Sequence, residues 1–153
     1  MNLLLFMHIA GALLFVGNII TAAFWKIRAD ATRNPVVIHE AAKNVMLADY
    51  VFTLPGLALL IVSGVSMAVR SGSFQSGFNW LTLSLLLFAV TGILWLGILI
   101  PLQRGMIRHS KQSVDSGVVS SEYRKASLYW AVFGTVTTLL PIVIMYLMIA
   151  KSF

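Results

Sequence analysis

The chain has 153 residues, of which 59% are apolar and 10% are charged, whereas soluble domains carry about 45–50% and 25%. These proportions exclude a water-soluble globule. Because the chain has no cysteine, it forms neither disulfides nor zinc–thiolate or iron–sulfur centres, and His, Met or oxygen ligands would have to hold any metal. The net charge of +6 fits contact with anionic lipid headgroups, and no aromatic and basic platform points to nucleic acid.

Four apolar runs follow one another along the chain, at residues 3–25, 46–69, 79–101 and 127–149. Each is long enough to cross a hydrocarbon core of ~30 Å as a helix, which takes about 20 residues. Backbone groups in lipid must be paired within the segment, and the runs lack the alternation of a membrane β-barrel. The sequence predicts an all-α, four-transmembrane-helix bundle that forms a single integral membrane domain over residues 1–153.

The predicted helices extend beyond the apolar runs, to about residues 3–25, 35–70, 79–112 and 122–150. The first run follows no basic residue and is longer than the apolar core of a secretory signal, so we expect a retained helix. Asn34 before Pro35 is typical of an N-cap followed by proline at the first helical position. Small residues at 71–73 and 75–77 are expected to end the second helix and form a tight turn, and 115–121 to form a loop.

Basic residues are distributed unevenly among the connections. Of the 11 Lys and Arg residues, only Arg70 and Lys151 lie outside the segments 26–45 and 102–126. The positive-inside rule therefore predicts a bacterial inner (plasma) membrane protein with both basic segments in the cytoplasm and both termini outside. Three tryptophans near the span ends are expected to anchor the helices at the membrane interfaces: Trp25, Trp80 and Trp130.

Each predicted helix carries one seam of small, polar, aromatic or thioether side chains at helical spacing. The seams consist of His8, Gly11, Phe15, Asn18 and Ala22; Asp49, Thr53, Gly56, Leu60, Gly64 and Met67; Trp80, Ser84, Phe88, Thr91 and Trp95; and Trp130, Gly134, Thr138, Pro141, Met145 and Met148. We expect these seams to meet inside the bundle. The seams have two possible roles: they only pack the helices against one another, as small residues do in membranes, or they also hold a cofactor. They are also compatible with a homodimer.

Asp49 is an ionisable residue inside a predicted span, where it costs about 2.5–3.5 kcal/mol on insertion scales. It lies near the basic side of that span. We therefore expect it to pair with Arg28 or Arg104 and to tie the basic segments to the bundle. A proton-handling role is the alternative.

His8 is the candidate cofactor-binding residue, because neutral imidazole is a common ligand of haem iron. Gly11, one turn away, would let a flat macrocycle approach the helix. The other helices present Gly64, Ser84 and Met145 at the same depth, so His8 and Met145 are candidate axial ligands.

Three points qualify this ligand set. Met67 and Met148 are alternative thioether ligands for the same iron. His39 and His109 belong to the opposite side of the membrane and are too far away to contribute. A hydrogen-bonded His8 without any cofactor is an equal alternative.

A resemblance to known protein families rests on residues that are spread over most of the chain. These are 7–11, 17–18, 23–26, 28–30, Asp49, 55–56, Gly64, Trp95 and 101–103. Over nearly the whole chain they resemble a bacterial family of predicted integral membrane proteins of unknown function. More distantly, the layout is similar to the four-helix, b-haem protoporphyrinogen oxidase family and to the copper-resistance protein D family. The likeness to the oxidase rests on His8-Ile9, on Pro55 with Gly64, and on Trp80-Leu81.

In the oxidase family the first-helix histidine is associated with haem, and the resemblance implies the same role for His8. Two departures weaken the parallel. Ser84 stands where that family has a lysine, and Thr53 stands where it tends to have methionine. Without a cation for a tetrapyrrole carboxylate, porphyrin oxidation is not the expected reaction.

Two functions from different classes remain. The first is a small inner-membrane protein with haem b, bound by His8, that passes electrons between a quinone or a redox protein and an acceptor. The second is a non-catalytic membrane subunit or assembly factor whose polar seam is purely structural. The sequence contains no nucleophilic triad, paired carboxylates or phosphate-binding loop, so no further enzymatic mechanism is predicted.

Overall fold

The structure is a computed structural model that describes residues 2–72 and 77–151. Its elements are α1 (Asn2–Ala31), α2 (Pro35–Ala48), η1 (Asp49–Thr53), α3 (Leu54–Arg70), α4 (Trp80–Leu94), η3 (Trp95–Leu99), α5 (Ile100–Ser116) and α6 (Ser121–Ala150). The two η elements are π-helical turns inside longer rods. Four rods are therefore long and apolar enough to cross a membrane: Asn2–Ala31, Pro35–Arg70, Trp80–Ser116 and Ser121–Ala150. The predicted all-α bundle with four spans is confirmed.

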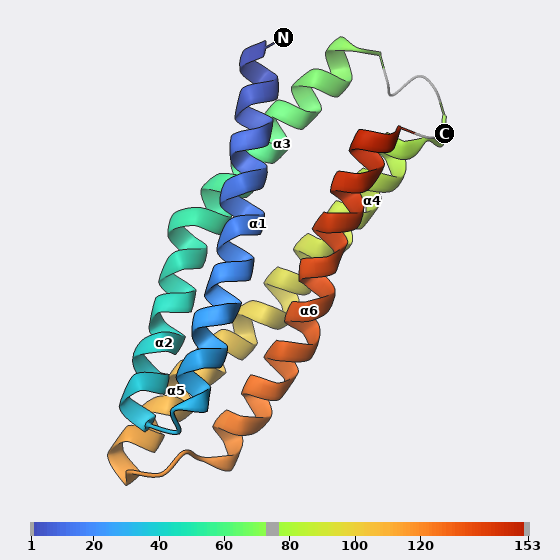
Figure 1. Cartoon of the computed structure of the whole chain (residues 1–153). Coiled ribbons are helices and arrows are strands. Elements are labelled where there is room, and N and C mark those ends of the chain that lie inside the picture. Colours follow the sequence, from blue (N-terminus) through green and yellow to red (C-terminus); the bar gives the residue numbers. More distant parts are fainter. Residues whose placement is uncertain (1, 73–76, 152–153) are drawn as a thin grey trace.

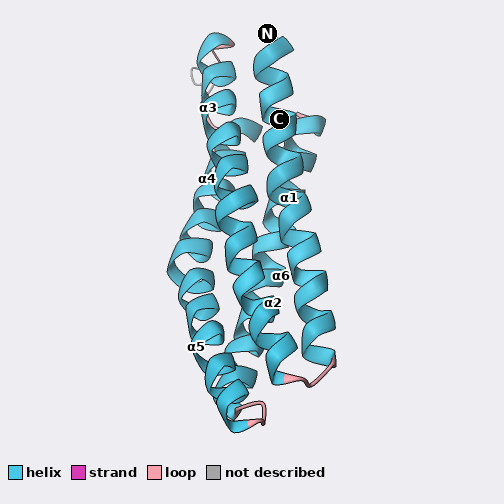
Figure 2. Ribbon diagram, turned by 90° about the vertical axis from the view of Figure 1, so that its left-hand side faces the viewer, coloured by secondary structure: helices cyan, strands magenta, loops and turns pink. Residues whose placement is uncertain are grey.

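Both termini lie at the same end of the bundle, which we call the terminal end (Figure 1). The opposite end, where the α1–α2 and α5–α6 connections lie, is the basic end. In the terminal half α1 packs on α3 and α4 packs on α6, and Figure 1 shows these two pairs diverging. Toward the basic end α2 contacts both α1 and α5, and α5 contacts α6, which closes the bundle (Figure 2).

Each π-helical turn lies just before a proline, Pro55 or Pro101. Proline has no N–H and cannot donate to the carbonyl four residues earlier. In both rods the residue before the proline donates its N–H to the carbonyl five residues earlier instead of four. The Leu54 N–H donates to the Asp49 carbonyl and the Ile100 N–H donates to the Trp95 carbonyl, five residues back. Such π-helical turns are rare in proteins, and those that occur often lie at functional sites.

The hydrophobic core fills the basic half, between α2, η3, α5 and α6. Its buried members are Ile38, Ala42, Val45, Trp95, Leu99, Ile100, Met106, Tyr123 and Trp130. The predicted seams are largely buried or half-buried. Trp130, predicted both as a membrane-interface anchor and as a member of the inward seam, belongs to this core and is 8% exposed. Trp25, in contrast, is 66% exposed on the surface.

The helix ends differ from the prediction in three places. α1 continues to Ala31 and α5 to Ser116, so both reach further toward the basic end than expected. Gly117, with φ 72°, ends α5, and the Ser120 side chain accepts from the Tyr123 N–H at the start of α6. The expected loop at 115–121 is therefore shorter. Ser71 ends α3 as predicted, whereas 73–76 in the expected turn lie outside the described residues.

The predicted N-cap of α2 is confirmed, because the Asn34 side chain accepts from the Val36 N–H at 3.0 Å and Pro35 takes the first helical position. Asn34→Ala is expected to lower the free energy of unfolding by ~1 kcal/mol. Thermal unfolding of the purified protein in detergent measures this change. Asn34→Asp retains the cap and should stay near the wild type, and equal losses in both variants would contradict the capping role.

Candidate functional site

His8 lies at the interface of α1 and α3 in the terminal half and is half-buried. Its Nδ1 is 3.1 Å from the Ser63 hydroxyl oxygen. Ser63 donates its own proton to the Leu59 carbonyl, so toward His8 it acts only as an acceptor. With Nδ1 as the donor to Ser63, the lone pair of the neutral imidazole would be on Nε2.

The predicted glycines are close to His8, but protein fills the space beside them. A Cβ on Gly64 would lie 3.0 Å from the His8 Cε1, so Gly64 accommodates the imidazole itself. A Cβ on Gly11 would lie 2.8 Å from the Gly56 carbonyl oxygen, so Gly11 lets α1 and α3 approach closely. Both glycines serve helix packing, as small residues commonly do in membranes.

Ser84 and Met145 do not join His8. Ser84 is buried on α4, in the other helix pair, and donates to the Trp80 carbonyl at 2.7 Å. Met145 was expected inside the bundle, but it lies on the outer surface of α6 and is 49% exposed. The buried residues Tyr123, Trp130, Thr137 and Ile144 recur every seven positions, and Met145 falls beside this stripe.

A second polar cluster surrounds Asp49, which is 5% exposed. One carboxylate oxygen accepts from the Asn18 amide at 3.1 Å and from the Thr53 hydroxyl at 2.8 Å. The other accepts from the Gln103 amide at 2.7 Å, and Asn18 also donates to Thr53 at 2.9 Å. We call Asn18, Asp49, Thr53 and Gln103 the Asp49 network; it joins α1, η1 and α5.

The expected pairing of Asp49 with Arg28 or Arg104 is wrong. In the part of the chain that the structure describes, the salt bridges are Lys26–Asp30 and Lys43–Glu40. The partners of Asp49 are instead neutral side chains. Gln103 had not been predicted as a site residue, because it follows Pro101 in a segment interpreted as a polar extension of the third helix.

Near the basic end, an ion pair within α1 is hydrogen-bonded to side chains of α6. Lys26 is 2% exposed and its ammonium lies 2.6 Å from an Asp30 carboxylate oxygen. Ser127 accepts from Lys26 and donates to Asp30, and the Tyr123 hydroxyl donates to Asp30 at 2.6 Å. The ammonium also lies over the Tyr123 and Trp130 rings, 5.7 and 5.2 Å from their centroids. We call these five residues the Lys26 cluster.

The family model described as "Predicted integral membrane protein (DUF2269)" matches residues 2–152. The chain belongs to this family. No curated protein and no solved structure matches the chain. The DUF2269 match agrees with the four membrane spans of the fold.

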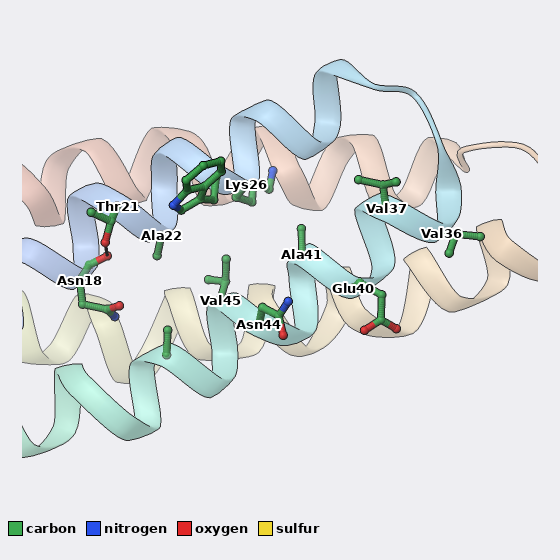
Figure 3. A pocket seen from close by; sticks show the side chains of 12 residues that line it. Asn18, Thr21, Ala22, Lys26, Val36, Val37, Glu40, Ala41, Asn44 and Val45 are labelled. Atoms are coloured by element: carbon green, nitrogen blue, oxygen red, sulfur yellow. Dashed lines mark hydrogen bonds between the residues drawn. The ribbon is translucent and has the colours of Figure 1, made fainter.

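In this DUF2269 protein a groove of about 640 Å³ opens between α1 and α2 (Figure 3). It is lined by Asn18, Thr21, Ala22, Trp25, Lys26, Val36, Val37, Glu40, Ala41, Asn44, Val45 and Ala48. Figure 3 shows Asn18 at one end and Glu40 nearer the α1–α2 connection. The groove thus reaches a member of the Asp49 network. Within residues 2–72 and 77–151, no three His, Asp or Glu side chains are grouped as a metal site.

Proposed function

We propose that this DUF2269 protein is a small membrane haem protein in which His8 supplies an axial ligand. The observation that supports this function most directly is the contact between His8 Nδ1 and the Ser63 hydroxyl. Histidines that bind a metal generally donate their other ring N–H to a neighbouring acceptor. Ser63 lies in position to be such an acceptor for Nδ1, and Nε2 would then be the nitrogen that binds iron. Haem b would supply a one-electron centre.

The structure is more compatible with His8 as a single protein ligand of the iron than with the predicted pair of His8 and Met145. His8 is half-buried among helices, and its hydrogen bond holds the ring in one orientation. Met145 faces outward, whereas the alternative thioethers Met67 and Met148 are both half-buried. Gly11 and Gly64 accommodate the packing of α1 against α3, and Ser84 donates to the Trp80 carbonyl of its own helix.

The proposal includes an orientation. The basic segments face the cytoplasm of a bacterial cell, both termini lie outside, and His8 belongs to the outer half of the membrane. A quinone in the bilayer or a redox protein outside would be the electron partner. His8 and Ser63 would fix the iron relative to α1 and α3, which are in close contact through Gly11 and Gly56.

Absorption spectra of the purified protein, oxidised and reduced, test this function. We expect a Soret band that co-purifies with the wild type and is lost in His8→Ala. His109→Ala, which changes a histidine near the basic end, should retain it. Ser63→Ala removes the acceptor of Nδ1 and should shift the reduction potential of the bound iron.

A colourless wild-type protein would contradict the haem function and favour the second candidate, a non-catalytic membrane subunit or assembly factor. One observation supports that candidate: the space beside both Gly11 and Gly64 is filled by the protein's own atoms. In that case His8→Ala would lower stability without any spectral change.

A further inference from the structure

The Asp49 carboxylate is buried, and no positively charged side chain among residues 2–72 and 77–151 is paired with it. Asn18, Thr53 and Gln103 donate hydrogen bonds to it, but these neutral groups do not compensate its charge. Buried charges in proteins are normally paired with an opposite charge or bind a metal ion. Lys26, which also lines the groove, is already paired with Asp30. The charge of Asp49 therefore lacks a counterion among the described side chains.

The second observation is an oxygen atom without a hydrogen-bond donor. Gln103 is 2% exposed and uses its amide nitrogen for Asp49. Its Oε1, on the same amide and hence beside the carboxylate, is buried and has no partner among the described residues. Asn18 likewise donates from its amide nitrogen to the Asp49 carboxylate. Because the amide oxygen of Asn18 is bonded to the same carbon as this nitrogen, it lies in the same region. Buried acceptors are rarely unsatisfied, and this one is free to contact a bound ligand.

Chemistry and charge together define the class of ligand. The atoms available are carboxylate, amide and hydroxyl oxygens, which are the ligands preferred by hard cations. The network holds a single carboxylate, so one positive charge neutralises it, whereas a divalent ion would leave a net positive charge in the membrane. Nitrogen and sulfur ligands, which softer metals prefer, are absent from the Asp49 network.

The groove between α1 and α2 provides a route to this position. Asn18 lines its inner end and Glu40, whose side chain is 56% exposed, lines it closer to the α1–α2 connection (Figure 3). Thr21 and Asn44 add polar groups between them.

We propose that the Asp49 network binds a monovalent hard cation such as Na⁺, which reaches it through the groove from the basic end. Asp49 supplies the charge and one or both carboxylate oxygens. The Gln103 and Asn18 amide oxygens and the Thr53 hydroxyl complete the oxygen set. The site is separate from His8 and does not depend on the haem function.

Binding of radiolabelled Na⁺ to the full-length protein in lipid nanodiscs tests this proposal. Unlabelled NaCl should displace the bound label, whereas choline chloride at the same ionic strength should not. Asp49→Asn should lose binding, and Gln103→Leu, which keeps the charge but removes the unpaired oxygen, should weaken it at least about tenfold. Asp115→Asn makes the same chemical change at an exposed position and should bind like the wild type.

A second measurement uses only the wild type, in case a variant does not fold. NaCl should raise its thermal unfolding midpoint above that in choline chloride, because a ligand that binds only the folded state stabilises it. Absence of displaceable Na⁺ binding by the wild type, or equal binding by Asp49→Asn, would overturn the proposal. Equal midpoints in both salts would also overturn it, as expected if a proton neutralises Asp49.

Discussion

Asp30→Asn is expected to lower the free energy of unfolding by about 3–5 kcal/mol, the largest effect of any single substitution considered. Lys26 is 2% exposed, so its ammonium would remain buried after losing the carboxylate 2.6 Å away. Tyr123 and Ser127 would lose their acceptor as well. The contacts of the ammonium with aromatic rings would stay, but they are weaker than the ion pair.

Equilibrium unfolding in detergent, followed by tryptophan fluorescence, measures this loss. Lys26→Met combined with Asp30→Asn should recover a large part of it, because the double variant leaves no charge without a partner. Glu40→Gln breaks the other ion pair, whose side chains are 50% and 56% exposed, and should cost at most about 1 kcal/mol. Similar losses in Asp30→Asn and Glu40→Gln would contradict a special role for the buried pair.

Gly11→Ala is the second substitution with a large expected effect, a destabilisation of about 1–3 kcal/mol. The new methyl group would lie 2.8 Å from the Gly56 carbonyl oxygen and 2.9 Å from the Leu59 Cβ. Because one of these atoms belongs to the backbone, α1 and α3 must move apart. The displacement would also weaken the contact between His8 and Ser63, which joins the same two helices.

Gly17→Ala is the matched control on the same helix, since nothing lies within 4 Å of its new methyl group. It should be neutral or slightly stabilising, because alanine has the higher helix propensity. Thermal unfolding of both variants in the same detergent makes the comparison. If Gly11→Ala were as stable as Gly17→Ala, the close approach of α1 to α3 would not contribute to stability.

Much of the architecture follows from patterns that are local in the sequence. Apolar runs fix the spans, and Asn34 with Pro35 fixes the start of α2. The turn at Arg33 and Asn34 also sets the register of two neighbouring rods. Asn18 and Asp49 are equally far from this turn, and so are Gly11 and Gly56, so antiparallel pairing brings each pair to one level. These contacts could have been predicted from the position of the turn.

Gln103 could not be placed in the same way. At 100° per residue it lies about 80° around the helix from Trp95, off the predicted seam. The π-helical turn η3 winds less per residue, so Trp95, Leu99 and Gln103 all lie on the buried face. The hydrogen bond from Ile100 to Trp95, just before Pro101, marks this change of period.

Two other differences have separate causes. Met145 was placed by a wide seam on the fourth helix, but the buried stripe there is narrower and follows a seven-residue spacing. Lys26 was assigned to a basic connection because it follows the apolar run. It is buried because α1 continues past it, which puts Asp30 one turn away and Ser127 of α6 beside both.

The divergence of the two helix pairs has a mechanical consequence (Figure 1). The hydrophobic core, the Lys26 cluster and the Asp49 network all connect helices of different pairs or lie where the bundle is closed. In the terminal half, α1 with α3 and α4 with α6 form two arms without such cross-links among the described residues. Lateral pressure from the surrounding lipid would therefore change the separation of the two arms by bending the bundle where they join. The buried charged groups lie at this junction.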